Sequence, residues 1–475
     1  MSPSSPPLAV SDLPLELILA VFYWCTLASP DAPLTISSVC RRWLQLARSS
    51  PELWTRLDLH FHSLPHNPDP AQGKHSLSHA VQKATAWFDR SGIASLDVQI
   101  TIRNPAARPC RRSPSPSPSP SPSPSSPITI PSDSPLASLF QTHIHRIRTL
   151  VVHAPSEAGI QPLIRPFHFP EPAPADDSPR SSLLELELEA TDDSPPAHPP
   201  LTDSAVATLP FVTPKPISVH LTNLAVPSTW LNLESLASLT VTHPILAPPL
   251  SLTHIFALLE KSPALQYFSL HSRIFEAPAA SSLSPIRTLS LPHLHSLHLT
   301  LNNTIDVLLA LRTPTLSTLS ITDLDGRAPW TGRALKAFLT SRPPLKHVKF
   351  ERLLGIEHGT WEWCLARLPL LEGASLAYCE RGEYIVAALA RRPGDKPEPQ
   401  SLARARAEPT ELCPGLRHLS LVQCPGVYDS ILPWFRTIRP QLRMDVVNCS
   451  DAEDEEGGWE GWDGLASRGW GVHLR

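Results

Sequence analysis

The spacing of leucines along the chain is the feature that most constrains its fold. From residue 236 onward the pattern L-x-x-L-x-L recurs at intervals of 22 to 29 residues, and weaker copies begin at Ile147 and Leu183. The clear copies begin at Leu236, Leu265, Leu294, Leu316, Leu345, Leu371 and Leu416. Such a spacing predicts a buried strand in each copy, stacked on its neighbours so that the copies share one continuous core.

The segments between these strands predict helices, because apolar residues recur in them at helical spacing and a proline often ends them. The clearest examples are residues 252–263, 332–343 and 360–369. Alternating strands and helices predict an α/β solenoid with its helices on one side. The pattern resembles leucine-rich repeats. Around residues 286–299 two registers compete, since Ile286-Leu289-Leu291 and Leu294-Leu297-Leu299 both fit the template.

Proline and serine interrupt this regular pattern. The chain has 56 prolines in 475 residues, and residues 113–127 are an almost unbroken Ser-Pro run that has no apolar face to bury. We therefore expect a disordered tail over 1–10, a helical module over 11–60, the first solenoid units over 61–103 and a disordered Ser-Pro linker over 104–135. An irregular solenoid over 136–475 follows, with loops near 170–182, 191–204, 393–411 and 451–464.

The N-terminal stretch LPLELILAVFYWC, residues 13–25, predicts a helix that is apolar almost all the way round. Pro14 suits the first helical position, and Glu16 then meets the positive end of the helix dipole. Residues 36–48 predict a second helix, and Ser50-Pro51 starts a third short one that carries Leu53 and Trp54. A unit of about fifty residues cannot bury so much apolar surface internally. Part of the first helix must face the rest of the chain or a partner.

These residues resemble the F-box family over residues 11–60. The matching positions are Leu13-Pro14-x-Glu16-Leu17-Ile18, Val21-Phe22, Val39-Cys40-Arg41-Arg42-Trp43, Leu46-Ala47 and Ser50-Pro51-x-Leu53-Trp54, and similar sequences occur in fungal F-box-like proteins. The resemblance implies a three-helix module that docks on a Skp-type adaptor and, through it, on a cullin scaffold. It implies that the adaptor contacts Leu13, Pro14, Leu17, Ile18, Val21, Phe22, Val39, Cys40 and Trp43.

One departure from the family pattern is the connection from Tyr23 to Ile36, which is longer than the usual short turn. An alternative interpretation of the module is that its three helices only cap the N-terminal end of the following domain. Cys379 and Cys424 each follow the last leucine of a repeat by three positions. They resemble the cysteines of the leucine-rich repeats that often follow F-boxes, and we expect them to be buried packing residues.

Charge and motif content exclude several other classes. The formal net charge of −4 and the pI near 6.6 argue against nucleic-acid binding and against anionic membranes. No segment has the ~20 apolar residues of a membrane span, and the N-terminus lacks the basic region of a signal peptide. The scattered cysteines indicate an intracellular protein, cytoplasmic or nuclear. We find no catalytic motif, no metal-ligand set and no cofactor fingerprint, and therefore expect a protein that is not an enzyme.

The combination favours a substrate-recognition subunit of an SCF-type ubiquitin ligase. The module would hold the adaptor, and the solvent-facing strand positions of the solenoid would hold a protein target. The best candidates for target contact are Tyr267, His271, His347, Lys349, Glu351 and His418. The alternative is a non-catalytic leucine-rich-repeat scaffold that binds proteins without recruiting ubiquitination.

Overall fold

The computed structural model divides the chain into two compact units, residues 1–316 and 317–475. It describes residues 13–62, 70–103, 135–155, 157–164, 182–191, 217–224, 235–244, 249–275, 288–325, 329–380, 382–390, 412–424, 435 and 437–449. The expected tail over 1–10 and nearly all of the expected linker and four loops lie outside these residues. None of the described helices combines the length and apolar character that a bilayer span requires.

The N-terminal module consists of helices α1 (Leu15–Ala28), α2 (Ala32–Val39) and α3 (Arg41–Ser49) and the 3-10 turn η2 (Pro51–Trp54). The prediction of a long connection from Tyr23 to Ile36 is wrong, because α1 continues to Ala28 and only three residues separate it from α2. Pro33 does not interrupt α2, since a proline in the first helical turn sacrifices no helical hydrogen bond. Pro14 caps α1 from outside instead of forming its first residue.

The helix predicted over residues 36–48 is two helices that meet at Cys40. The backbone of Cys40 is extended, with φ −157° and ψ 167°, and its Sγ accepts a hydrogen bond from the Trp43 backbone N–H at 3.5 Å. A side chain that satisfies a free N–H at a helix start is an N-cap. Cys40 therefore ends α2 and starts α3.

In unit 1 the main sheet is open and parallel, and its strands neighbour one another in chain order. The strands are β1 (Arg56–His62), β2 (Leu96–Arg103), β3 (Ile147–Ala154), β4 (Glu185–Ala190), β5 (Ile217–Thr222), β6 (Leu236–Thr242), β8 (Tyr267–Ser272) and β11 (Ser296–Leu301). Two short parallel pairs accompany it, β7 (Leu250–Ser251) with β9 (Ile274–Phe275) and β10 (Leu289–Ser290) with β12 (Leu311–Arg312).

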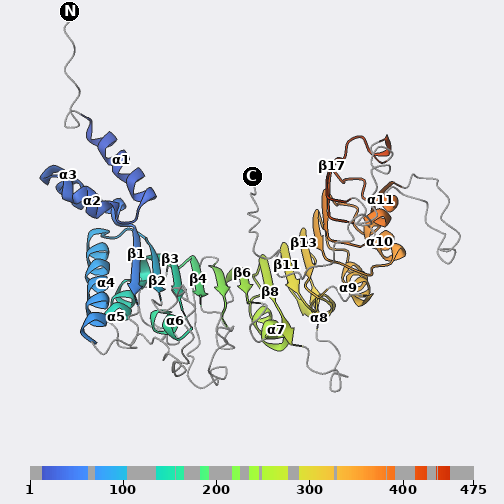
Figure 1. The fold of residues 1–475 in the computed structure, drawn as a ribbon, viewed down its shortest axis with the longest axis horizontal. Helices are drawn as coiled ribbons and strands as arrows, with labels where there is room; N and C mark the ends of the chain where they lie inside the picture. The colour runs from blue at the N-terminus through green and yellow to red at the C-terminus, as the bar shows by residue number, and fades with distance from the viewer. Residues whose placement is uncertain are drawn as a thin grey trace, which may run out of the picture. The chain divides into compact units, whose positions relative to one another are not determined.

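Helices cover one side of these strands (Figure 1). They are α4 (Pro70–Arg90), α5 (Pro135–His143), the 3-10 turn η4 (Ile144–Arg146), α6 (Glu157–Ile164), α7 (Leu252–Glu260) and α8 (Ile305–Ala310). Along the strands buried and partly exposed residues alternate, because successive side chains of a strand point to opposite faces. The apolar face meets the helices, and the opposite face, which we call the open face, remains accessible.

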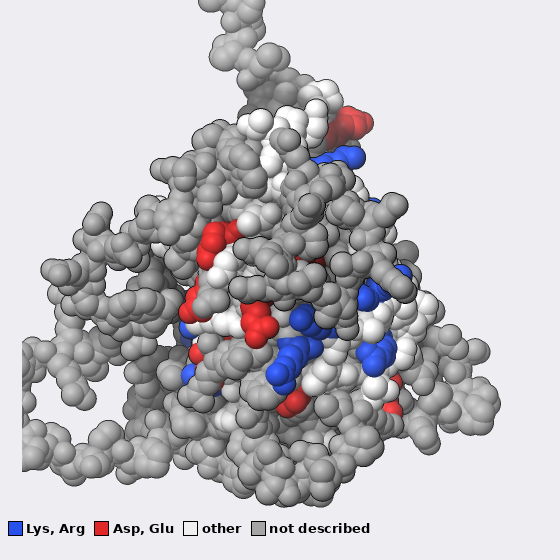
Figure 2. Space-filling model, turned by 90° about the vertical axis from the view of Figure 1, so that its right-hand side faces the viewer, with Lys and Arg blue, Asp and Glu red and all other residues white. Residues whose placement is uncertain are grey.

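Unit 2 repeats the arrangement with five parallel strands in chain order. They are β13 (Thr318–Asp323), β14 (His347–Glu351), β15 (Gly373–Ala377), β16 (His418–Val422) and β17 (Arg443–Val447), with helices α9 (Pro329–Leu339), α10 (His358–Leu365) and α11 (Gly382–Ala390). Figure 2 shows a face of the molecule on which the described acidic and basic side chains are both present, without a broad field of one sign.

Each of the nine predicted strands is confirmed, as β3, β4, β6, β8, β11, β13, β14, β15 and β16. Of the two competing registers, the one beginning at Leu294 forms β11 in the main sheet, whereas Leu289 lies in the short strand β10. Four strands were not predicted. In β2 and β5 the register shifts at the first residue, so the spacing contracts to L-x-V-x-I and I-x-V-x-L.

Trp54 fixes the module to the sheet, because the 3-10 turn that it ends is followed by β1 after one residue. Its side chain is fully buried, its Nε1 donates to the Ala47 carbonyl at 2.7 Å, and its ring meets Trp87 edge-on at 4.9 Å. Arg90 lies over the same ring at 4.4 Å. The module and the first strand–helix pair therefore share one core.

Polar contacts strengthen the same junction. Arg56 Nη1 donates to the Leu27 carbonyl at 3.0 Å, at the C-terminal end of α1. Lys83 Nζ on α4 contacts Asp31 Oδ1 at 2.5 Å and donates to the Asp58 carbonyl at 2.6 Å. These bonds join the α1–α2 turn, β1 and α4.

Arg146 is a buried cation whose replacement tests the core of unit 1. Its guanidinium donates to the carbonyls of Phe88 and Ala94, at 3.1 and 3.3 Å, and to Ser91 Oγ, and burial lowers its pKa. We expect Arg146→Lys to lower the free energy of unfolding by about 2 kcal/mol, because one ammonium cannot satisfy all three acceptors. Urea denaturation measures the change. Exposed Arg148→Lys is the comparison, and an equal loss there would contradict the assignment.

Candidate functional site

The most unusual surface of the described chain is the apolar outer side of α1. Leu17, Val21 and Trp24 are 53%, 54% and 69% exposed. With Leu13 they are spaced at i, i+4, i+8 and i+11, so they lie along one side of a helix that turns about 100° per residue. We call these four residues the α1 stripe. Isolated exposed leucines are ordinary, whereas a contiguous apolar stripe marks an interaction surface.

The inner side of α1 explains why its outer side is exposed. Only Ile18, Phe22 and Thr26 of α1 are buried, at spacings of four residues. Phe22 meets the Trp43 ring edge-on at 4.9 Å. A single buried stripe is all that two short partner helices can cover, so the remaining apolar residues of α1 have no intramolecular partner surface.

Other apolar side chains of the module are also accessible. Val39 at the end of α2 is 57% exposed, and Cys40 beside it is exposed as well. Leu15, Tyr23, Leu27 and Leu34 are each more than a third exposed. The apolar surface therefore extends beyond the stripe around α1 and onto α2.

The predicted adaptor contacts divide into two groups. Leu13, Pro14, Leu17, Val21, Val39 and Cys40 are exposed, and Trp43 is half-buried. Ile18 and Phe22 are only 3% and 1% exposed, which corrects the expectation of direct contact, because these two side chains form the inner core of the module. Their role is to hold the helices that present the accessible residues.

Sequence reasoning missed Trp24 as a candidate contact, although it is the most exposed residue of the stripe. The signal was present in the sequence, since Trp24 lies on the same side of the helix as Leu17 and Val21. A helix with apolar residues all round must leave some of them outward when its module has only two other short helices. Trp24 belongs on the list for that reason.

The predicted target contacts in unit 1 are Tyr267 and His271, which lie on the open face of β8. The Tyr267 ring is 5.1 Å from the His298 ring of the neighbouring strand β11. Burial lowers the pKa of His271, so this imidazole is neutral at pH 7. Both residues stand in a polar, uncharged part of the open face, where a neutral imidazole can donate or accept a hydrogen bond.

The other four predicted target contacts lie on the open face of unit 2. Lys349 and Glu351 share β14 and form an ion pair at 3.2 Å, and His347 on the same strand packs against Gly373 of β15. His418 on β16 contacts Asp445 Oδ2 on β17 at 2.8 Å, and this hydrogen bond lowers the pKa of Asp445. The structure brings these positions to one accessible sheet face, with their charges largely paired.

Three buried cysteines follow consecutive strands of unit 2 and form what we call the cysteine ladder, Cys379, Cys424 and Cys449. The Sγ atoms of Cys379 and Cys424 each donate to a carbonyl of their own strand and to one of the preceding strand, at 3.4 to 3.5 Å. Burial raises the pKa of Cys379 to about 12 and that of Cys424 to about 11. The expectation of buried packing residues is confirmed for both.

Cysteine labelling is a direct test of this part of the structure. We expect a maleimide to modify Cys25 and Cys40 rapidly in the folded protein, because both are exposed. The five buried thiols, Cys364, Cys379, Cys413, Cys424 and Cys449, should react only after denaturation. Peptide mass spectrometry reads each site separately. Labelling of the cysteine ladder at the rate of Cys25 would contradict the packing.

The described residues offer no group of three or more His, Cys, Asp or Glu side chains arranged to hold a metal ion. Their largest concentration of accessible apolar side chains is on the module, and the open faces are polar. What the arrangement provides is therefore surface for binding other macromolecules.

Comparison with known proteins gives one match. Residues 10–60 match the family model described as F-box-like, which spans the whole three-helix module. No curated protein matches the chain. Residues 10–60 thus form an F-box-like domain, and domains of this kind typically bind Skp-type adaptors.

Proposed function

We propose that the protein is the substrate-recognition subunit of an SCF-type ubiquitin ligase. The observation that carries the proposal is the exposed α1 stripe inside the segment that matches the F-box-like family. A Skp-type adaptor would cover Leu17, Val21 and Trp24, together with Val39 at the end of α2. Burial of large apolar and aromatic side chains at the centre of an interface is where most binding energy is concentrated.

The parallel sheets of the two units form the second half of the proposal, as leucine-rich repeats of a solenoid. Their support is the recurrent L-x-x-L-x-L strand, the order of the strands along the chain and the helices on the side opposite the open face. In such repeats the accessible strand face is an extended binding surface. A protein target would lie across these positions.

The proposed role is binding, without a chemical step of its own. Holding a target and an adaptor in one complex raises the local concentration of target lysines near a ubiquitin donor on the cullin scaffold, which converts an encounter into a nearly intramolecular step. The chain would act inside the cell, in the cytoplasm or the nucleus. A scaffold that binds proteins without recruiting ubiquitination is the alternative.

Purification of the full chain with a Skp-type adaptor tests the proposal. We expect the two to elute together in size-exclusion chromatography, and the complex to retain a cullin N-terminal domain. Deleting residues 1–60 would be a poor control, because it removes Trp54 and the start of β1 together with the docking surface. Full-length variants of the stripe are the proper comparison. Failure of the unmodified chain to retain any Skp-type adaptor would leave the scaffold interpretation.

A further inference from the structure

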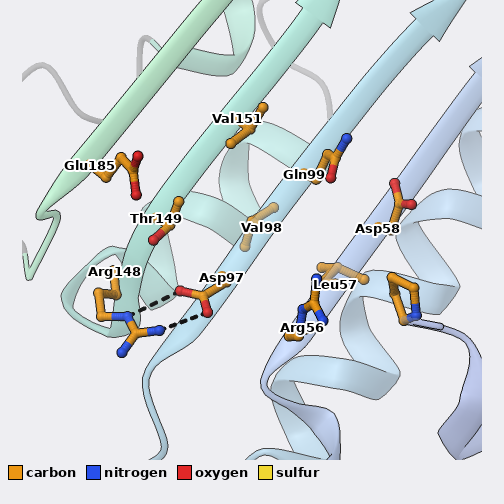
Figure 3. Close-up of a pocket in the computed structure, with 11 residues that line it drawn as sticks. Arg56, Leu57, Asp58, Asp97, Val98, Gln99, Arg148, Thr149, Val151 and Glu185 are labelled. Atoms are coloured by element: carbon orange, nitrogen blue, oxygen red, sulfur yellow. Dashed lines mark hydrogen bonds and ion pairs between the residues drawn. The ribbon is translucent and has the colours of Figure 1, made fainter. Parts of the chain in front are cut away.

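A hollow on the open face of unit 1 lies where β1, β2, β3 and β4 run side by side. Its volume is about 340 Å³, at the lower end of the range for ligand pockets in general. Figure 3 shows Asp58, Gln99 and Val151 along one row of adjacent strands, with Arg148 and Asp97 bonded at one end. None of these residues belongs to the α1 stripe, so the hollow is a separate candidate for binding.

The two arginines of the hollow already have partners. Arg148 makes a bidentate contact with Asp97, Nε to Oδ1 at 3.1 Å and Nη2 to Oδ2 at 2.8 Å, and this carboxylate raises the pKa of Arg148. Arg56 directs Nη1 to the carbonyls that end α1. Bidentate pairing fixes a guanidinium in place and uses its strongest donors. The positive charges of the hollow are therefore committed within the protein.

The carboxylates of the hollow are not matched in the same way. Asp58 Oδ2 contacts His60 at 3.1 Å, while Asp58 Oδ1 has no hydrogen-bond partner among the described residues. Glu185 is exposed and has no hydrogen bond or ion pair with a described residue, although it lies in the field of Arg148. Glu187 follows two residues along the same strand face. The neighbouring open face of β5 and β6 supplies no Lys or Arg, so the excess is negative.

The shape of the hollow narrows the occupant further. Val151 lies on the floor of the hollow between Asp58 and Glu185, with Thr149 beside it (Figure 3). Lys and Arg side chains bury their aliphatic stems on apolar surface and direct their charge to acceptors at the rim. An anion such as a phosphate group would instead meet three carboxylates and two arginines that already have partners.

From these observations we propose that the hollow binds a lysine- or arginine-bearing segment of a partner protein. The cationic side chain would lie over Val151 and direct its donors to Asp58 and Glu185. This binding does not depend on adaptor docking, and the two are measured separately. If the proposed function holds, the segment belongs to the target, and the hollow selects targets with basic, accessible stretches.

The test uses the full-length chain and a short fluorescein-labelled peptide in which lysine alternates with serine. We expect saturable binding by fluorescence anisotropy at low salt, weakened at high salt because exposed charge pairs are screened. The double variant Asp58→Asn/Glu185→Gln should bind about tenfold more weakly, at a few-fold for each exposed carboxylate removed. Circular dichroism verifies that these near-isosteric changes leave the fold intact.

Glu189→Gln is the matched control, because Glu189 lies on the same strand face but already pairs with His153 at 2.5 Å outside the hollow. It should leave peptide binding unchanged. A second variant, Glu185→Lys, should shift preference toward a peptide with glutamate in place of lysine. The proposal is overturned if the double variant binds the lysine peptide as well as the unmodified chain does. Equal loss in Glu189→Gln, or a preference of the unmodified chain for the acidic or a phosphoserine peptide, also overturns it. Adaptor capture by the same samples reports on the proposed function independently.

Discussion

Replacing Leu17 and Val21 together by aspartate is expected to lower the affinity for a Skp-type adaptor at least about a hundredfold while leaving the protein folded. The loss follows because both side chains are more than half exposed in the centre of the α1 stripe, where a partner would bury them. Two buried, unpaired carboxylates would also oppose association. Surface changes of this kind alter the free energy of unfolding by only about 0.5 kcal/mol. Calorimetry with purified adaptor measures the first quantity, and urea denaturation the second.

Ile93→Asp is the control for this experiment. Ile93 is 99% exposed and lies away from the module, in the turn after α4, so its replacement adds a charge to apolar surface without touching the stripe. It should bind adaptor like the unmodified chain. Undiminished adaptor binding by the Leu17/Val21 variant would exclude the α1 stripe as the docking surface. A variant that binds weakly only because it unfolds would be recognised from its denaturation curve.

Trp54→Ala is expected to lower the free energy of unfolding by about 3–5 kcal/mol, the range for large aromatic side chains removed from a core. Trp54 is fully buried and contacts both the module and α4, and its truncation also leaves the Ala47 carbonyl without its 2.7 Å hydrogen bond. Because α3, β1 and α4 all meet this ring, the loss should loosen the whole junction. Guanidinium denaturation followed by far-ultraviolet circular dichroism measures the effect.

Trp24→Ala is the matched comparison, since it removes the same side chain from an exposed site. Trp24 is 69% exposed, so its truncation should change the free energy of unfolding by about 0.5 kcal/mol or less. It should instead weaken adaptor binding. The two tryptophans thus separate stability from recognition. Equal destabilisation by both changes would contradict the burial assigned to them.

The strands were predictable where the leucine pattern kept its full spacing. Leu236, Leu239 and Val241 of β6 fit the L-x-x-L-x-L template, and the structure buries all three. The pattern failed where a register shift removes one residue, as in β5, where Ile217, Val219 and Leu221 occupy the same three buried places. A template of fixed spacing cannot detect this contraction, although the core that it describes is the same.

β17 and β1 escaped prediction for related reasons. β17 has the contracted spacing Leu442-x-Met444-x-Val446, which also concealed Cys449 as the third member of the cysteine ladder. In β1 the first apolar position of the template is filled by Trp54, which the sequence assigned to the helical module. One residue therefore serves two elements, and neither the module boundary near residue 60 nor the first strand could be placed from spacing alone.

The exposed and buried sides of α1 could not be separated from the sequence, because every side of the helix is apolar. Ile18 and Leu17 are adjacent and chemically alike, yet one is 3% and the other 53% exposed. Only the positions of α2 and α3 decide which side is covered. The hollow on β1 to β4 was equally hidden, since its carboxylates come from strands that lie far apart in the chain.

The one-residue step from η2 to β1 has a mechanical consequence. Thr55 alone separates the last residue of the helical module from the first strand, and Arg56 of that strand holds the end of α1. No swivel lies between the α1 stripe and the first strands of unit 1. Whatever grips the stripe therefore also sets the bearing of those strands, and a ligand in their hollow is carried as by an arm bolted at its shoulder.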